Sequence, residues 1–430
     1  MTRLAYLFLL LCLVACSKDD ASDNPTPPPA RRTVVVYMSG ENNLESYDYL
    51  ESDLAEMKTG RRLAGEDERL VVFVDKLARG VKPFLAQVTT DGRLDTLYRY
   101  GEDFYSSDPA QMSDVLRKAI TLCPATEDYG LVLWGHANSW LIERDSIAMQ
   151  GNRAYGYDTG EDKGNGRQGR WMNIPTLRMV LASLPVRWKF IFCDCCNMLS
   201  AEVAYELRQH TDYLIGSPAE IPGIGAPYHQ IVKDLFCHDD ATMYTGLCDH
   251  YFTQTGDNPS EHPPLAVVKT AAIPQLAAAT RQVLPHVAQY LENAQPPTDG
   301  TIYYYGDPKN DGDKSHYDMK DVISRALSGE PTLYQQWAEA FRQAVVYSIP
   351  STYWQTGRTT SGSPYVRFSD FTELRDGTRT FKHGDECCGV MSMFFPMERY
   401  NSTNRPYNED IKQLGWYYAA GWQETLNFLP

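Results

Sequence analysis

Residues 129–135 read YGLVLWG and residues 189–195 read KFIFCDC. Each is a short apolar run without polar alternation, so both faces of each strand must be covered. Three more such runs occur, at 33–38, 69–75 and 212–217. Amphipathic helical stretches separate the runs, and strands that alternate with helices form a parallel sheet between two helical layers. We therefore predict an α/β fold, a three-layer α/β/α sandwich whose central sheet is largely parallel.

The segments between these strands also predict secondary structure. Residues 84–100 contain two alternating segments around Asp91 and Gly92, a pair of residues typical of a hairpin turn. We expect this hairpin to extend one edge of the sheet. The amphipathic stretches predict helices over residues 43–58, 109–123, 174–184 and 199–210.

The first residues predict export. Residues 1–15 carry one Arg and a short apolar run, too short to cross a bilayer. Their ending, Leu-Val-Ala before Cys16, resembles a bacterial lipobox, in which the cysteine is lipidated and becomes the mature N-terminus; ordinary signal cleavage nearby is the alternative. Residues 16–32 are polar and Pro-rich, which predicts a flexible tether. The acidic residues 17–20 resemble sequences that send some lipoproteins to the outer surface. We expect a chain anchored by lipid in the outer membrane of a bacterial cell envelope.

Residues 33–260 hold the α/β pattern, and its character changes at residue 261. Residues 261–430 are predicted to complete this domain or to pack on it, as a second domain or as added helices. This half contains a strand-like 263–269, a helical 272–294, an aromatic and acidic 301–318 and an apolar 387–396.

The composition and the cysteine positions argue against a nucleic-acid partner and against disulfide bonds. The chain carries 40 Lys and Arg against 55 Asp and Glu, a formal charge of −15, and its basic residues do not cluster, so nucleic acid is not an expected partner. Cys193, Cys195 and Cys196 lie together at an apolar run, as do Cys387 and Cys388. We expect most of these cysteines to be buried thiols rather than disulfides, and no zinc spacing occurs.

Two strand ends bring chemically competent residues together. The strand at 129–135 is followed by His136, and the strand at 189–195 is followed by Cys196. Ligands of open parallel sheets bind beyond the carboxyl ends of the strands. A thiol at the start of a helix and a neighbouring imidazole form a nucleophile and its base. A structural histidine and a core cysteine are the alternatives for each residue alone.

Five ordered segments resemble the clostripain-like cysteine peptidases, which have the caspase-like fold. TVVVYMSGENNLE (33–45) is similar to the opening strand and turn of that family, and LVLWGHANSW (131–140) to its histidine strand. DCCNMLSAEVAYEL (194–207), GSPAEIPGIGAPY (216–228) and LGWYYAAGWQETL (414–426) resemble its cysteine segment, pocket loop and closing segment. The resemblance covers most of the chain.

The resemblance implies a role for each of these residues. Cys196 would be the nucleophile that forms a thioester with a protein or peptide substrate, and His136 would be the general base and acid. The backbone N–H groups of Cys196 and of residue 136 or Ala137 would bind the oxyanion. Cys195 stands where the family has Ala, and strand alternation predicts that it points away from His136.

The same resemblance points to a substrate pocket with two departures. Asp194 resembles the acidic pocket residue of the family, with a helix N-cap as the alternative. Where the family has the Asp that helps to hold a basic P1 side chain, this chain has Ile224, and Asp194 or Glu220 would have to compensate. Ala137 and Ser139 replace glycines after the histidine, which costs energy if that loop needs positive φ. The P1 preference is left open.

Residues 151–174 are rich in Gly and charge and predict a long exposed loop. The family cuts itself between its His and Cys strands, so Arg153, Lys163, Arg167 and Arg170 are candidate cleavage sites; a loop that is merely long and polar is the alternative. No cofactor or metal is expected. Calcium is reported for part of the family, but Asp307, Asp311 and Asp313 do not have the spacing of a known calcium loop.

The rival hypothesis is a catalytically weak or inactive member of the family that acts as a surface binding module. The departures at Ala137 and Ile224 favour this rival. The presence of both His136 and Cys196 favours the enzyme, because a site that has lost its reaction needs neither residue. An unrelated hydrolase or thiol transferase, and a redox switch between Cys195 and Cys196, are lesser alternatives.

Overall fold

The structure is a computed structural model of the whole chain. It describes residues 28–78, 80–142, 154–160, 169–254, 262–293, 305, 315–351, 353–355, 365–367, 388–397 and 406–426. The predicted signal segment, Cys16 and most of the tether lie outside these residues. In the described part of the chain, no helix combines the length and the apolar character that crossing a membrane requires.

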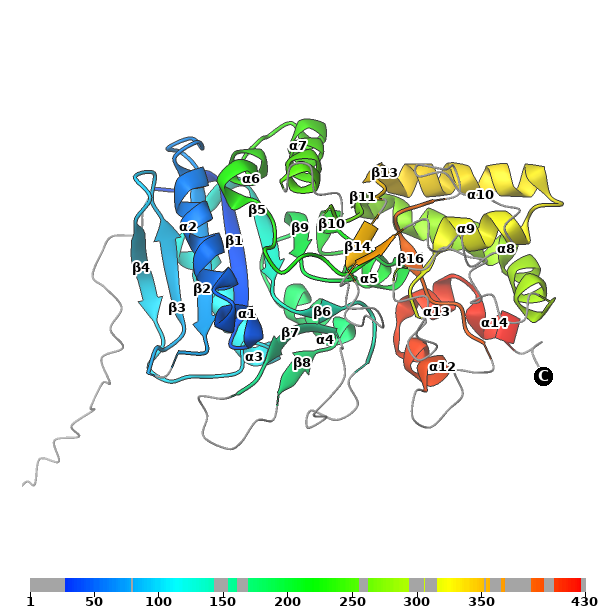
Figure 1. Cartoon of the computed structure of the whole chain (residues 1–430), viewed down its shortest axis with the longest axis horizontal. Coiled ribbons are helices and arrows are strands. Elements are labelled where there is room, and N and C mark those ends of the chain that lie inside the picture. The colour runs from blue at the N-terminus through cyan, green and yellow to red at the C-terminus, as the bar shows by residue number, and fades with distance from the viewer. Residues whose placement is uncertain are drawn as a thin grey trace, which may run out of the picture.

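A nine-stranded sheet forms the centre of the fold, in the order β13-β11-β10-β9-β5-β1-β2-β3-β4 (Figure 1). Its five central strands are parallel, which confirms the predicted α/β class. They are β1 (Ala30–Gly40), β2 (Arg69–Lys76), β5 (Ala125–Trp134), β9 (Trp188–Asp194) and β10 (Thr211–Gly216). The hairpin of β3 (Phe84–Val88) and β4 (Leu94–Arg99) lies at one edge, where it was predicted.

Helices cover both faces of the sheet, as strands that are apolar on both sides require. Along β1, Val34 and Val36 pack into one buried cluster and Val35 and Tyr37 into another. The first cluster contains side chains of α2 (Tyr49–Arg61), α6 (Tyr228–Leu235) and α7 (Asp240–Thr253). The second contains side chains of α3 (Pro109–Leu122), α4 (Ile174–Ala182), α5 (Ala201–Leu207) and α8 (Ile273–Asn293).

The N-terminal boundary and the first helix differ from the prediction. Strand β1 begins at Ala30, inside the stretch assigned to the tether, because the buried Arg32 guanidinium pairs with Asp128 and donates to two backbone carbonyls. The helix expected over 43–58 is two helices, α1 (Asn43–Ser46) and α2. They are separated at Asp48, which has a left-handed φ of 61°.

The second half of the chain completes the sheet rather than forming a separate core. Strands β11 (Leu265–Lys269) and β13 (Val345–Ile349) extend it beyond β10 in antiparallel fashion. The remaining elements lie beside this edge (Figure 1). They are α9 (Met319–Ala326), α10 (Pro331–Ala344), α12 (Tyr407–Asp410), α13 (Gly415–Ala419), α14 (Trp422–Leu426), the pair β12 (Tyr317–Asp318) and β16 (Ser392–Met393), and the pair β14 (Tyr353–Gln355) and β15 (Tyr365–Arg367).

A small sheet occupies part of the segment expected to be an exposed loop. It consists of β6 (Ala137–Asn138), β7 (Ala154–Asp158) and β8 (Arg170–Met172). Strand β7 is largely buried, because the Tyr155 hydroxyl lies 3.2 and 3.3 Å from the carbonyl oxygens of Tyr37 and Trp134. The prediction of an exposed loop over 151–174 is therefore wrong for β7, which packs against the ends of β1 and β5.

Candidate active site

His136 and Cys196 leave the sheet at the same edge. Strands β5 and β9 are parallel neighbours, and Trp134 of β5 is in register with Asp194 of β9. Each candidate residue follows its strand by two positions, so both lie beyond the carboxyl end of the central sheet. The sequence predicted this arrangement from strand ends alone, and the register of the two strands brings it about.

The two adjacent thiols face opposite sides of the sheet. Cys195 is fully buried in the cluster under α3 and α4, whereas Cys196 is half-buried and packs against the cluster under α2 and α6. The Ile221 N–H lies 3.4 Å from the Cys196 sulfur. All seven cysteines among the described residues are free thiols. Cys196 is therefore the thiol of this pair that has access to the strand-end site.

The thiol of Cys196 does not lie at a helix N-terminus, which corrects the sequence-based expectation. Helix α5 begins at Ala201, and its N-cap is Ser200, whose hydroxyl accepts the Val203 N–H at 3.2 Å. Burial and the neighbouring carboxylate of Glu220 raise the pKa of Cys196 to about 12, against a small lowering by the Ile221 N–H. The resting thiol is protonated at neutral pH.

The imidazole of His136 is held between two elements. Its Nε2 lies 2.6 Å from Oδ1 of Asn43, the first residue of α1. Its backbone oxygen accepts the Gly156 N–H of β7 at 2.8 Å, and its ring lies 6.4 Å from the ring of Tyr157. Burial lowers the pKa of His136 to about 4, so the imidazole is neutral at pH 7. The pair thus rests as neutral thiol and neutral imidazole.

Hydrogen bonds join the loops that follow the two strands. The Ser139 hydroxyl donates to the Ser200 hydroxyl at 2.9 Å, and the Asn197 amide donates to Asn138 Oδ1 at 3.2 Å. Ser139 and Asn197 both have left-handed φ, 59° and 61°. The backbone strain anticipated from the lost glycines therefore falls at Ser139. Ala137 avoids it, since Ala137 is buried in β6 and pairs with Tyr155.

Two buried carboxylates lie close to each other at the end of β9, and one of them, Asp194, is two residues before Cys196. Asp194 accepts hydrogen bonds from the hydroxyls of Tyr228 and Tyr251, at 2.8 and 3.0 Å, and from the Ala226 N–H at 3.2 Å. Its carboxyl is therefore not the helix N-cap that was the alternative assignment. The second carboxyl is Asp53 of α2, which accepts the Trp134 indole N–H at 2.6 Å.

Electrostatic repulsion couples these two carboxyls. Burial, followed by the negative charge of Asp194, raises the pKa of Asp53 well above its ordinary value, and burial raises that of Asp194 to about 6. Sequence analysis missed Asp53. The signal was present, because Asp53 lies between Leu50, Leu54 and Met57 at the spacing of a buried helix face.

The isoleucine of the pocket loop, Ile224, has its side chain exposed at the surface. Ile224 is 43% exposed and lies between Gly223 and Gly225. The α-carbon of Gly225 faces both carboxylates, because a Cβ there would lie 3.0 Å from Asp53 Oδ2 and 3.1 Å from Asp194 Oδ2. Glu220 is half-buried and raises the pKa of Cys196. The isoleucine therefore does not fill the space next to Asp194.

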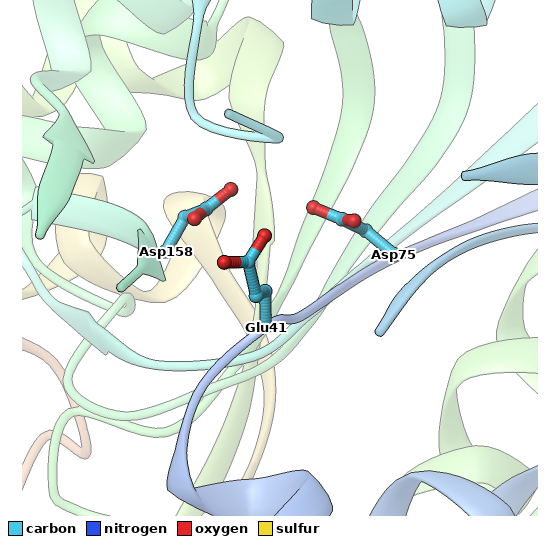
Figure 2. Close-up of side chains that lie close together, drawn as sticks. All are labelled: Glu41, Asp75 and Asp158. Atoms are coloured by element: carbon cyan, nitrogen blue, oxygen red, sulfur yellow. The ribbon is translucent and has the colours of Figure 1, made fainter. Parts of the chain in front are cut away.

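One set of residues in the described part of the chain has the geometry of a metal site. Glu41 follows β1, Asp75 is the next-to-last residue of β2 and Asp158 ends β7, and carboxylate oxygens of all three lie within 4.8 Å of one another. Figure 2 shows the three carboxyl groups converging. Asp158 also accepts the Ser106 N–H at 2.7 Å and the Gly160 N–H at 2.8 Å. Oxygen ligands of this kind suit hard cations such as Ca²⁺ or Mg²⁺.

The remaining predicted residues fall largely outside the described ranges. Of the candidate cleavage sites, the structure describes Arg170, which is exposed in β8 with its guanidinium 4.1 Å from the centre of the Tyr105 ring. Outside the described residues lie Arg153, Lys163, Arg167, Asp307, Asp311 and Asp313.

Known proteins resemble this chain in sequence and fold. Residues 36–428 match the model of the Clostripain family. A secreted C11 cysteine protease from Bacteroides thetaiotaomicron, solved with an irreversible peptide inhibitor, is 26% identical with a TM-score of 0.71, over 92% of this chain and all of that one. An inactive zymogen C11 protease from Parabacteroides distasonis is 25% identical with a TM-score of 0.70, over 92% and 99%. No curated protein matches the chain. The chain belongs to the clostripain family and is a cysteine endopeptidase with the caspase-like α/β fold.

Proposed function

We propose that this endopeptidase works through Cys196 as nucleophile and His136 as general base and acid. The observation that carries this proposal is the register of β5 and β9, which places the two residues beyond the same edge of the sheet. Cys195, the competing thiol, is fully buried on the other face. A nucleophile needs a path to its substrate, and of these two thiols Cys196 is the one that is not fully buried.

The resting charges define how the reaction begins. Because the pKa of Cys196 is raised to about 12 and that of His136 lowered to about 4, the resting pair is not an ion pair. His136 therefore takes the thiol proton as the sulfur attacks the peptide carbonyl. The proton then passes to the leaving amine, the acyl group stays on sulfur as a thioester, and water releases it. The N–H groups of Cys196 and Ala137 are the proposed oxyanion donors.

We further propose that the P1 side chain is basic. Asp53 and Asp194 are buried close to each other under the pocket loop, and no cation of the described residues is among the leading causes of the pKa shift of either carboxyl. A buried negative charge without a cation is costly, and an Arg or Lys side chain of the substrate would supply one. In a peptide library, Asp53→Asn is expected to lower kcat/KM for basic P1 residues at least about tenfold relative to neutral ones. Unchanged selectivity would argue for a neutral P1 residue.

Self-processing and lipid anchoring complete the proposal. A basic P1 preference makes Arg153, Lys163, Arg167 and Arg170 substrates of the enzyme itself. Lipidation at Cys16 places the chain at the outer membrane, and the relative from Bacteroides thetaiotaomicron is a secreted protease. Labelling with a radioactive fatty acid is expected to mark the full chain and not Cys16→Ala.

The decisive experiment compares wild type, Cys196→Ala and Cys195→Ala, each expressed from residue 17. Intact mass should show cleavage within residues 151–170 in the wild type and in Cys195→Ala, but not in Cys196→Ala. Hydrolysis of a peptide substrate should follow the same order. If all three are inert against a full peptide library, the rival hypothesis of a binding module gains support. If Cys195→Ala is the inactive variant, the assignment of the nucleophile is wrong.

A further inference from the structure

We propose that Asn43 is a positioning residue of the active site, which holds the His136 ring through its side-chain oxygen in the orientation and tautomer that catalysis needs. The inference rests on the proposed roles of His136 and Cys196. It adds a third residue to that pair, from the first position of α1.

The contact itself fixes the tautomer. Asn43 Oδ1 lies 2.6 Å from His136 Nε2, a short distance for a nitrogen to oxygen hydrogen bond. An amide oxygen only accepts hydrogen bonds, so Nε2 must carry the proton and donate it. Nδ1 then keeps its lone pair and is the nitrogen that can take a proton from the Cys196 thiol.

Hydrogen bonds in the turn before Asn43 fix the position of this residue. The buried side chain of Asn42 donates to the carbonyl oxygens of Ser39 and Tyr157, at 2.9 and 2.8 Å, and accepts the Leu44 N–H at 2.9 Å. The Thr159 N–H also donates to the Glu41 carbonyl at 2.9 Å. The two residues before Asn43 are thus tied to β1 and to the end of β7, and Asn42 in turn holds the residue after it.

The same strand holds the histidine. Gly156 of β7 donates its N–H to the His136 carbonyl at 2.8 Å, one residue before the carbonyl that Asn42 contacts. Strand β7 therefore holds both the backbone of His136 and the residue that precedes Asn43. A hydrogen bond between two groups fixed in this way loses little conformational entropy and sets the ring angle closely.

No charged group competes for this role in the described part of the chain. Burial is the cause of the lowered pKa of His136, no carboxylate forms an ion pair with its ring, and Tyr157 is the titratable side chain whose ring faces it. A neutral amide acceptor orients the ring without making the imidazole strongly basic. The Asn43 side chain is exposed to solvent, and a bound peptide that excludes water would strengthen the bond.

The test measures kcat, KM and their pH profiles on a peptide substrate for wild type, Asn43→Ala and Asn43→Asp. Ser46→Ala is the matched control, because Ser46 is an exposed residue of the same short helix. In Asn43→Ala we expect kcat to fall about 10- to 100-fold with little change in KM, because the ring loses its orientation. The acid limb of the profile should move to lower pH by about half a unit to one unit, because an acceptor stabilises the imidazolium more than the neutral ring.

Asn43→Asp should move the acid limb in the opposite direction and recover part of kcat, because a carboxylate still accepts from Nε2 and favours the imidazolium. The proposal is overturned if Asn43→Ala keeps the wild-type kcat and acid limb. It is equally overturned if both variants lose activity with an unmoved acid limb, which is the result of a merely structural role. Failure of the underlying dyad is distinguishable, since Cys196→Ala would then retain activity.

Discussion

At the scale of single residues, the surroundings of Cys196 favour its protonated thiol over the reactive thiolate. The carboxylate of Glu220 and burial both oppose the thiolate of Cys196. A thiol with a pKa near 12 reacts slowly with alkylating reagents at neutral pH, because the thiolate is the nucleophile. The chain therefore protects Cys196, the proposed nucleophile, from adventitious oxidation and alkylation until a substrate is bound.

Replacing Glu220 by Gln tests this interpretation. Removing the negative charge should lower the pKa of Cys196, so the rate of alkylation by iodoacetamide at pH 8 should rise by about 2- to 10-fold. The rate is measured from the mass of the labelled protein over time. Glu339→Gln, at an exposed site on α10, is the control and should leave the rate unchanged. Equal rates in all three proteins would show that Glu220 does not act on the thiol.

At the scale of elements, the turn between β1 and α1 depends on one buried side chain. Asn42 makes three hydrogen bonds, two as donor and one as N-cap acceptor. We expect Asn42→Ala to lower the free energy of unfolding by about 2–4 kcal/mol, because buried backbone carbonyls lose their partners and α1 loses its cap. Urea denaturation measures this change. Asn42→Asp keeps the cap without the donors and should be intermediate; a wild-type midpoint for both variants would contradict the account.

Elements that follow a hydrophobic period were predictable, and elements held by tertiary hydrogen bonds were not. The strands at 69–75 and 189–195 could be identified because their residues are apolar on both faces. Strand β7 could not, since its segment is short and contains glycine, and its burial depends on contacts of Tyr155 with β1 and β5. The left-handed φ at Asp48 that divides α1 from α2 likewise has no local signal strong enough to read.

The residues of the candidate site also fall into a group that the sequence predicted and a group that it did not. His136 and Cys196 follow strand ends in the sequence, Asp194 lies within the last residues of its strand, and all three were found there. Asn43 and Asp53 act across space, one through a hydrogen bond to His136 and the other from a helix face beneath the pocket loop. Spacing along the chain does not reveal such contacts, although a carboxylate on the apolar face of α2 was a visible anomaly.

At the scale of the whole molecule, the sheet needs both halves of the chain. Strand β11 pairs with β10 and β13 pairs with β11, so the two strands cover an edge that would otherwise be open. A chain that ends at residue 260 is therefore expected to lack a cooperative thermal unfolding transition, measured by circular dichroism. A chain that ends at residue 426 keeps all of these strands and should unfold as the full chain does. A stable, cooperative 17–260 fragment would refute this dependence.

The two halves are also joined by a buried carboxyl whose state depends on pH. Glu202 of α5 accepts the Phe394 N–H at 2.8 Å, and burial raises its pKa to about 7 from an ordinary value of 4.5. Between these pH values the folded chain holds a proton that the unfolded chain has released, so the stability contributed by this group is present below about 4.5 and is lost as pH rises through about 7.

Glu202→Gln removes this titration. The difference in unfolding free energy between wild type and variant should change by about 3 kcal/mol from pH 4.5 to pH 8, in favour of the variant at the higher pH. Denaturant titrations at the two pH values measure it. Parallel pH dependence of the two proteins would mean that Glu202 ionises normally in the fold.

The pairing of β5 with β9 has a consequence for how such an enzyme is regulated. These strands flank the segment proposed for self-cleavage, and they are neighbours in the middle of the sheet, joined from Tyr129 and Trp188 to Trp134 and Asp194. Cutting between them would yield two polypeptides whose shared boundary is the hydrophobic centre of the protein. Such pieces do not drift apart on dilution. Maturation would therefore be a one-way step, and only an inhibitor or destruction of the protein could end its activity.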